Sequence, residues 1–136
     1  MDMIRKADYF SVEVPNKVGE GARLLGALRD AGINLAAFTA FPSGRRAQID
    51  FIPEDTAAFK KAARKLGIDV SPRKTVFIAQ GDDRPGAIAE LCEKLASTGI
   101  NIIAMDAASA GNGRYGAMFW VAPGDVRRAS KALGAS

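Results

Sequence analysis

The chain contains no histidine among its 136 residues, and this absence limits its possible chemistry more than any other feature. Without histidine there is no Ser-His or Cys-His catalytic pair and no metal site built on imidazole. Cysteine is nearly absent too, because Cys92 is the one example. An intrachain disulfide is therefore impossible, and Cys92, at a periodic apolar position, is expected to be a small core residue. We predict a protein that is not an enzyme and that carries no metal ion or other cofactor.

Long apolar runs are also lacking. No segment approaches the length needed to span a bilayer, and no apolar signal-peptide core follows the charged residues between Met1 and Asp8. These absences predict a cytoplasmic protein that has no membrane partner. Apolar residues make up 48% of the chain and charged residues 25%, which is typical of a globular protein and not of a disordered one.

An internal repeat with an offset of 67 residues organises the chain. Under this offset Ile33-Asn34-Leu35 falls on Ile100-Asn101-Ile102, and Leu66-Gly67 falls on Leu133-Gly134. Further aligned pairs are Phe10 with Phe77, Leu24 with Leu91, Leu28 with Leu95, and Gly32 with Gly99. The repeat predicts two modules, residues 1–70 and residues 71–136.

The apolar periodicity of the first copy predicts six elements. They are a strand at Tyr9–Val14, a helix ending near Ala31, strands at Leu35–Phe41 and Ala47–Ile52, a helix containing Phe59–Leu66, and a strand at about Ile68 to Lys74. This β-α-β-β-α-β order is the split arrangement of ferredoxin-like domains. We therefore predict an α+β fold with two such modules in tandem, each with an antiparallel sheet and with helices on one face.

The second copy is predicted to lack its final strand, because only Gly134-Ala135-Ser136 follow its second helix. In this topology the final strand pairs with the first, so the strand predicted at Thr75–Gln80 has an open edge. An open edge invites another strand to dock. We expect a homodimer in which a second chain covers this edge. The alternative is that the N-terminal residues Met3 to Asp8 fold back over it.

Two motifs in each copy resemble the ACT domain, a regulatory module found on amino-acid-metabolising enzymes and in free tandem proteins. The family pattern is Asn/Asp-basic-Pro-Gly after the first strand and Gly-Ile-Asn-Ile after the first helix. The second copy has both in full, as Asp83-Arg84-Pro85-Gly86 and Gly99-Ile100-Asn101-Ile102. The first copy has Asn16-Lys17-Val18-Gly19, in which Val18 departs from the pattern, and Gly32-Ile33-Asn34-Leu35. The resemblance covers residues 8–136 and implies a regulatory sensor that binds a free amino acid and acts on a partner enzyme of amino-acid metabolism.

The chemistry of a free amino acid suits the same positions. A helix N-terminus after a glycine turn offers unpaired N–H groups to a carboxylate, and an asparagine amide both donates and accepts hydrogen bonds. The candidate ligand-binding residues are Asn16, Lys17, Gly19, Asn34 and Leu35 in the first copy, and Asp83, Arg84, Gly86, Asn101 and Ile102 in the second. For Asn16 and Asp83, the alternative is that they only cap the helices.

Two other functions compete with the sensor hypothesis. One is a protein-interaction module without a ligand. The other is RNA binding, since the same topology hosts RNA-binding modules and the net charge is +4. The basic residues Lys60, Lys61, Arg64 and Lys65 lie opposite the apolar face of a predicted helix, which is typical of a solvated surface. The strands also lack the aromatic signature of RNA readers, so no nucleic acid partner is expected.

Overall fold

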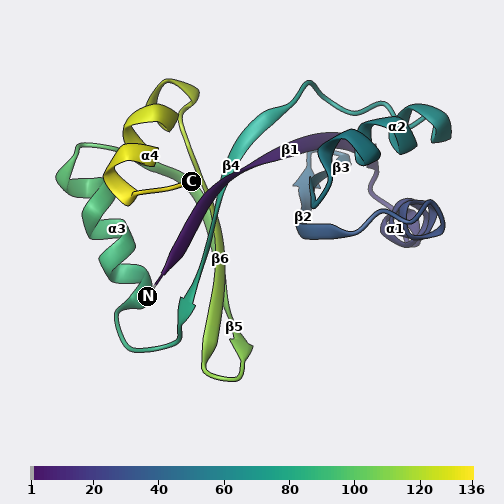
Figure 1. Cartoon of the computed structure of the whole chain (residues 1–136). Helices are drawn as coiled ribbons and strands as arrows, with labels where there is room; N and C mark the ends of the chain where they lie inside the picture. Colours follow the sequence, from purple (N-terminus) through teal and green to yellow (C-terminus); the bar gives the residue numbers. More distant parts are fainter. Residues whose placement is uncertain (1) are drawn as a thin grey trace. The chain divides into compact units, whose positions relative to one another are not determined.

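The computed structural model describes residues 2–136. The chain divides into two compact units (Figure 1). The first unit is Asp8–Lys74, and the second is Thr75–Ser136 together with the residues up to Ala7. In each repeat the order of elements is strand, helix, strand, strand, helix. None of the helices in the described part is long and apolar enough to cross a membrane.

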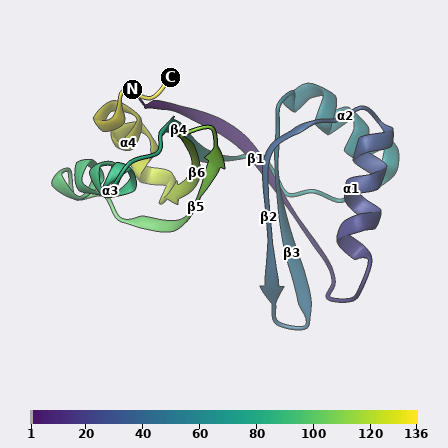
Figure 2. The ribbon, with the colours of Figure 1, turned by 90° about the horizontal axis from the view of Figure 1, so that it is seen from below.

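The first unit is an antiparallel sheet covered on one face by two helices (Figure 2). Its elements are β1 (Met3–Pro15), α1 (Glu20–Asp30), β2 (Leu35–Ser43), β3 (Arg46–Pro53) and α2 (Thr56–Leu66), and its strand order is β2-β3-β1. The core lies between sheet and helices, where the Phe59 ring is 5.2 Å from the Phe10 ring and 5.6 Å from the Phe51 ring between centroids. Leu24 and Leu28 of α1 complete this core.

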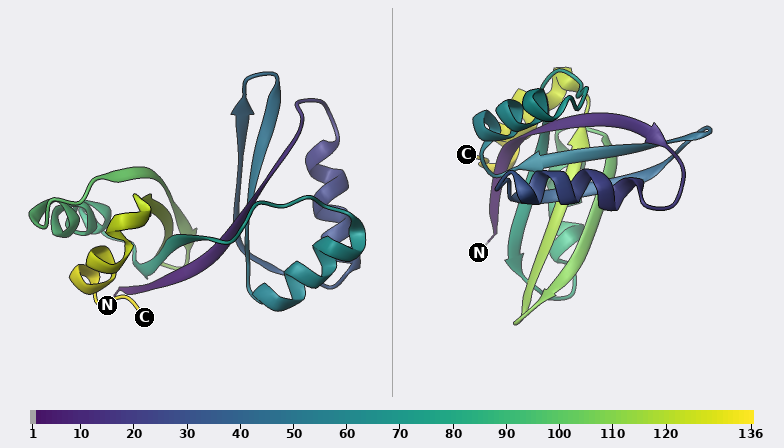
Figure 3. Two further views of the ribbon diagram at one scale, coloured as in Figure 1. Left: turned by 90° about the horizontal axis from the view of Figure 1, so that it is seen from above. Right: turned by 90° about the vertical axis from the view of Figure 1, so that its right-hand side faces the viewer.

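The second unit repeats this arrangement. Its elements are β4 (Lys74–Asp82), α3 (Ala87–Ser97), β5 (Ile102–Gly111), β6 (Arg114–Val121), a 3₁₀ turn (Pro123–Asp125) and α4 (Val126–Leu133). The strand order is β4-β6-β5, and α3 and α4 lie on the same face of the sheet (Figure 3). The Phe77 and Phe119 rings stack in its core with centroids 5.1 Å apart. The predicted α+β class is confirmed, with two modules in tandem, antiparallel sheets and helices on one face of each sheet.

The 67-residue offset aligns positions that have the same structural role in the two units. The aligned pairs Phe10 and Phe77, Leu24 and Leu91, and Leu28 and Leu95 are all buried core residues. Gly32 and Gly99 both have a positive φ just past a helix. Ile33 and Ile100 then donate backbone hydrogen bonds to Leu28 and Leu95, which is the expected left-handed helix end.

The strand β1 starts at Met3, six residues earlier than Tyr9, where the first strand was predicted. Its first residues belong to the second unit, where β1 neighbours β4 in the strand order and Ile4 packs against the core. Ser136 N donates to the Ile4 carbonyl at 3.2 Å, and Lys6 N donates to the Ser136 carbonyl at 3.1 Å. Ser136 therefore lies beside the first residues of β1. The edge of β4 was expected to be covered either by a second chain or by the N-terminal residues. In this structure the N-terminal residues of β1 lie beside β4.

The predicted fourth strand of the first copy, at about Ile68 to Lys74, is wrong. Residues 68–73 are irregular, and Lys74 begins β4. The segment does run beside β1, because Ser71 N donates to the Ser11 carbonyl at 2.8 Å and Ser11 N donates to Ser71 Oγ at 2.9 Å. A side-chain hydroxyl thus takes the bond that a ladder would give to a backbone carbonyl, and Pro72 has no N–H to continue the ladder. In the second copy no strand follows α4 up to Ser136, within the described residues.

Candidate functional site

The predicted ligand residues of each copy fall into two groups. Asn16, Lys17 and Gly19 form the turn before α1, and Asp83, Arg84 and Gly86 form the turn before α3. The N-cap residues are the glycines themselves, with φ of 93° at Gly19 and 82° at Gly86, and no side chain caps either helix. Asn16 and Asp83 are therefore not helix caps. In residues 2–136, no side chain accepts from the N–H groups of the first turns of α1 and α3. The first N–H of each helix is used within the turn, because Glu20 N donates to the Lys17 carbonyl and Ala87 N donates to the Arg84 carbonyl.

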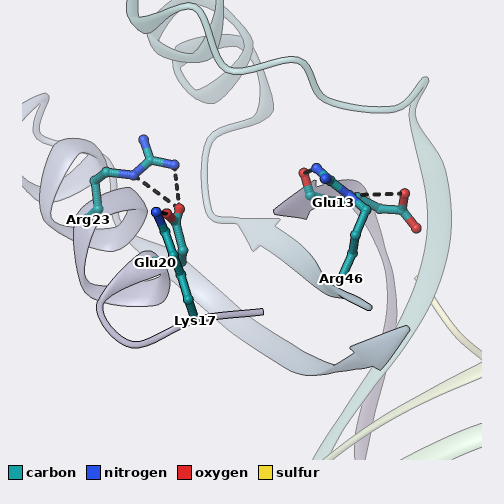
Figure 4. A network of polar contacts seen from close by, with 5 residues as sticks. All are labelled: Glu13, Lys17, Glu20, Arg23 and Arg46. Atoms are coloured by element: carbon teal, nitrogen blue, oxygen red, sulfur yellow. Dashed lines mark hydrogen bonds and ion pairs between the residues drawn. The ribbon is translucent and has the colours of Figure 1, made fainter. Parts of the chain in front are cut away.

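The turn before α1 already contains a carboxylate. Glu20, the first residue of the helix, accepts hydrogen bonds from Arg23 Nε and Nη2 at 3.2 and 2.7 Å, and Lys17 Nζ lies 3.6 Å from its other oxygen (Figure 4). The Arg23 hydrogen bond holds the pKa of Glu20 below its usual value, so this side chain is anionic at neutral pH. A second carboxylate placed at this helix end would meet the charge of Glu20.

The turn before α3 differs at this position. Ala87 stands where the first copy has Glu20, so no carboxylate occupies the first position of the helix. The acidic residue of the first turn is Glu90, one helical turn further on, and it forms an ion pair with Arg84 that lowers its pKa. The backbone N–H of Asp83 donates to the Gly113 carbonyl at 2.8 Å and so ties the turn to the β5–β6 hairpin.

A buried tyrosine lies near this second turn. Tyr115 of β6 is opposite Gly81 of β4, and its side chain packs in the same core cluster as Ala87. A β-carbon at Gly81 would be 2.8 Å from the Tyr115 ring, so only glycine leaves room for it. The hydroxyl is buried, and burial, together with the nearby Asp2 carboxylate, raises the pKa of Tyr115. Nothing in the sequence marked this residue, because its position depends on the pairing of β4 with β6.

The two asparagines, Asn34 and Asn101, also differ between the copies. Asn34 Nδ2 donates to the Glu54 carboxylate, and Glu54 N donates back to the Asn34 carbonyl at 3.1 Å. The amide of Asn101 is exposed and makes no hydrogen bond within residues 2–136. Leu35 and Ile102, which follow the asparagines, are half-buried and pack against the cores of their units. The free amide is therefore the one in the second copy.

Each helix keeps the turn and the asparagine of its own copy apart. In the second copy, α3 has 11 residues between Gly86 and the segment that leads to Asn101. A helix of this length spans about 16 Å, which is far longer than the few ångströms between the carboxylate and the ammonium of an amino acid. The same holds for α1 between Gly19 and Asn34. A single small ligand that touches both groups therefore needs the turn of one module and the asparagine of another.

The described residues contain no cluster of side chains suited to hold a metal ion. Within residues 2–136, no group of three or more Cys, Asp or Glu side chains is placed to hold a metal ion. The charged residues around the turns are paired, as in Arg84 with Glu90 and Arg114 with Asp82. The turns offer backbone N–H groups, and the position just before β5 offers the amide of Asn101.

The comparison with known proteins fits this arrangement. Residues 74–135 match the family model of the ACT domain. This match bears out the resemblance found in the sequence. No curated protein matches this sequence.

Solved structures share the fold of the whole chain. Protein BT0572 from Bacteroides thetaiotaomicron is 21% identical, with a TM-score of 0.80 over 98% of this chain and 88% of its own. The regulatory subunit of aspartate kinase from Thermus thermophilus, in its ligand-free form, is 18% identical, with a TM-score of 0.63 over 98% and 94%. The regulatory subunit of aspartate kinase from Thermus flavus is 19% identical, with a TM-score of 0.59 over 98% and 94%. At these identities the likeness is one of fold.

Proposed function

With an ACT domain at residues 74–135 as the premise, we propose that this chain is a non-catalytic regulatory protein that binds a free amino acid. The single observation that carries the proposal is the contrast between the two copies. The second copy has a helix N-terminus without a carboxylate at its first position and an Asn101 amide without a partner in residues 2–136. In the first copy the corresponding groups face Glu20 and are bound to Glu54.

The proposed site is made from two modules. The ligand carboxylate is held by the N–H groups at the start of α3, behind Gly86, where the helix dipole favours an anion. The amide of Asn101 from another module meets the ligand's polar groups, since it both donates and accepts. Because α3 separates the two groups within one module, this site fits an assembly of modules, and a homodimer is the assembly we propose.

The partner is proposed to be an enzyme of amino-acid metabolism in the cytoplasm. Two structures that share the fold are described as regulatory subunits of aspartate kinase, which supports a regulatory role exerted on a separate catalytic chain. Nucleic acid is not the proposed partner. Phe10 and Phe77, on the first strand of each copy, are 1% exposed and are not available for stacking on bases. The exposed strand phenylalanines, Phe38 and Phe41, lie on β2 of the first copy.

Isothermal titration calorimetry of the full chain against each of the twenty amino acids tests this proposal. We expect saturable binding of one amino acid or of a chemically related few. A short RNA serves as the competing ligand, and its binding would weaken steeply with salt. Saturable binding of RNA together with no response to any amino acid would overturn the proposal.

A further inference from the structure

A groove in the first unit lies beside the turn before α1, since Pro15 and Arg23 are among its lining residues, and it includes no residue of the turn before α3. It has a volume of about 560 Å³ and is lined by residues of β1, of α1, of the start of β3, and of the end of α2 with the segment that follows it. This size is in the range of small-molecule sites. Its charged lining residues are Glu13, Arg23, Arg46 and Asp69, and its apolar ones include Leu66 and Ile68.

The groove lies where the sheet lacks its fourth strand. Ser11 directs its backbone groups away from β3, because it exchanges hydrogen bonds with Ser71. Backbone groups alternate in direction along a strand, so the N–H and the carbonyl of Glu13 also point away from β3, toward the groove. The residues that precede Ser71 do not form a strand beside β1. The outer edge of β1 at Glu13 is therefore not covered by a strand of the first unit.

The edge is poorly suited to accept a peptide strand. Arg46 Nη2 donates to the Glu13 carbonyl at 3.1 Å and occupies the acceptor that a docking strand would need (Figure 4). Pro15, at the end of the same edge, has no N–H to donate. Charged side chains and proline are the devices that keep an edge strand from pairing. The groove therefore presents the Glu13 N–H and side chains.

These side chains carry both signs of charge. Arg46 Nη2 donates to the Glu13 carbonyl, and Arg46 Nε lies 3.9 Å from the Glu13 carboxylate. Arg23 donates to Glu20 through Nε and Nη2. A guanidinium has five N–H donors, so each arginine retains others. Asp69 makes no ion pair within residues 2–136. Guanidinium groups and the Glu13 N–H suit a carboxylate, while Asp69 suits an ammonium. Leu66 and Ile68 offer apolar surface between them.

We propose that this groove is a second binding site, and that its ligand is a small zwitterion, namely a free amino acid with an apolar side chain. The carboxylate is bound by Arg46 and the Glu13 N–H, and the ammonium by Asp69. None of these residues belongs to the turns before α1 and α3. Ligand binding in the groove can therefore be tested independently of ligand binding at α3.

Amide NMR spectra of the full chain during titration with leucine test the groove site. The amide signals of Gly67, Ile68 and Asp69 should shift saturably, and they should still do so in the Asn101→Ala variant. Leucinamide, which lacks the carboxylate, and N-acetylleucine, which lacks the ammonium, should each bind about 10-fold more weakly or worse. Equal binding of either analogue, or no saturable shift at these amides with millimolar leucine, isoleucine, valine or methionine, would overturn the proposal.

Neighbouring arginines provide a matched pair of variants. Arg46→Gln removes the guanidinium that lines the groove and should weaken leucine binding about 10-fold or more. Arg45→Gln changes a residue that does not line the groove and should alter the affinity by less than about 2-fold. Half of the Arg46 side chain is exposed, so both variants are expected to fold. Equal affinities of the two variants would also overturn the assignment.

Discussion

Replacing Ile4 by alanine should destabilise the unit that is distant from it in sequence. Ile4 belongs to the first strand of the first copy, yet it packs against the core cluster that contains Phe77 and Phe119. Each buried methylene is worth about 0.8 kcal/mol, and the substitution removes three carbons from a half-buried side chain. We expect a loss of about 1–2 kcal/mol, because part of that side chain is already in contact with water.

Hydrogen exchange of backbone amides measures where this loss falls. Amides of β4 and β6 that exchange through opening of their unit should lose protection by about 5- to 30-fold. Amides of β2 and β3 should change far less. Met3→Ala is the control, because Met3 lies in the same strand and is 68% exposed, so its effect should stay within about 0.5 kcal/mol. Equal effects of the two variants, or a loss of protection confined to β2 and β3, would refute the placement of the N-terminal residues.

Two further predictions concern the turns. Arg23→Gln should raise the pKa of Glu20 toward its usual value, as measured by NMR titration of the carboxyl group, since the Arg23 hydrogen bond is what lowers it. A carboxyl group whose pKa is lowered in the folded state stabilises the fold above its unfolded pKa, and this stabilisation is lost as the pH falls through the folded pKa. The free energy of unfolding of this variant should therefore fall less in acid than that of the parent chain. An unchanged pKa of Glu20 would rule out the ion pair. Gly86→Ala forces a side chain into a backbone with φ of 82° and should cost about 1 kcal/mol or more in urea unfolding. Gly116→Ala, in open space without a positive φ, should be close to neutral, and a similar cost for both would contradict the strained turn.

The repeat and the apolar periodicity were enough to predict most of the fold. The 67-residue offset identified the core pairs, and the glycines at positions 32 and 99 marked the helix ends, because these features depend only on local chain geometry. The fourth strand of the first copy could not be excluded in this way. Residues 68–73 contain alternating apolar positions, Ile68 and Val70, which do pack on the core. The Ser71 hydroxyl bond that interrupts the ladder depends on tertiary contact.

The candidate site was predicted in its parts and not in its assembly. The glycine turns and the asparagines were identified from their motifs. Their separation within one copy follows from the 11-residue length of α3 in the structure. The ion-pair partners of the charged residues could not be predicted from the sequence either, but one difference between the copies was visible in it. Alignment of Glu20 with Ala87 under the 67-residue offset already showed that the two helix starts differ in charge. Tyr115 was missed because its environment depends on strand pairing.

The most direct test of the proposed function compares two asparagine variants. Calorimetric titration with the amino acid identified by the screen should show that Asn101→Ala weakens binding by about 1–3 kcal/mol, roughly 5- to 150-fold. Asn34→Ala should leave the affinity nearly unchanged, because the Asn34 amide is already bound to Glu54. If Asn101→Ala binds the amino acid as tightly as the parent chain does, Asn101 is not part of the site and the account is contradicted.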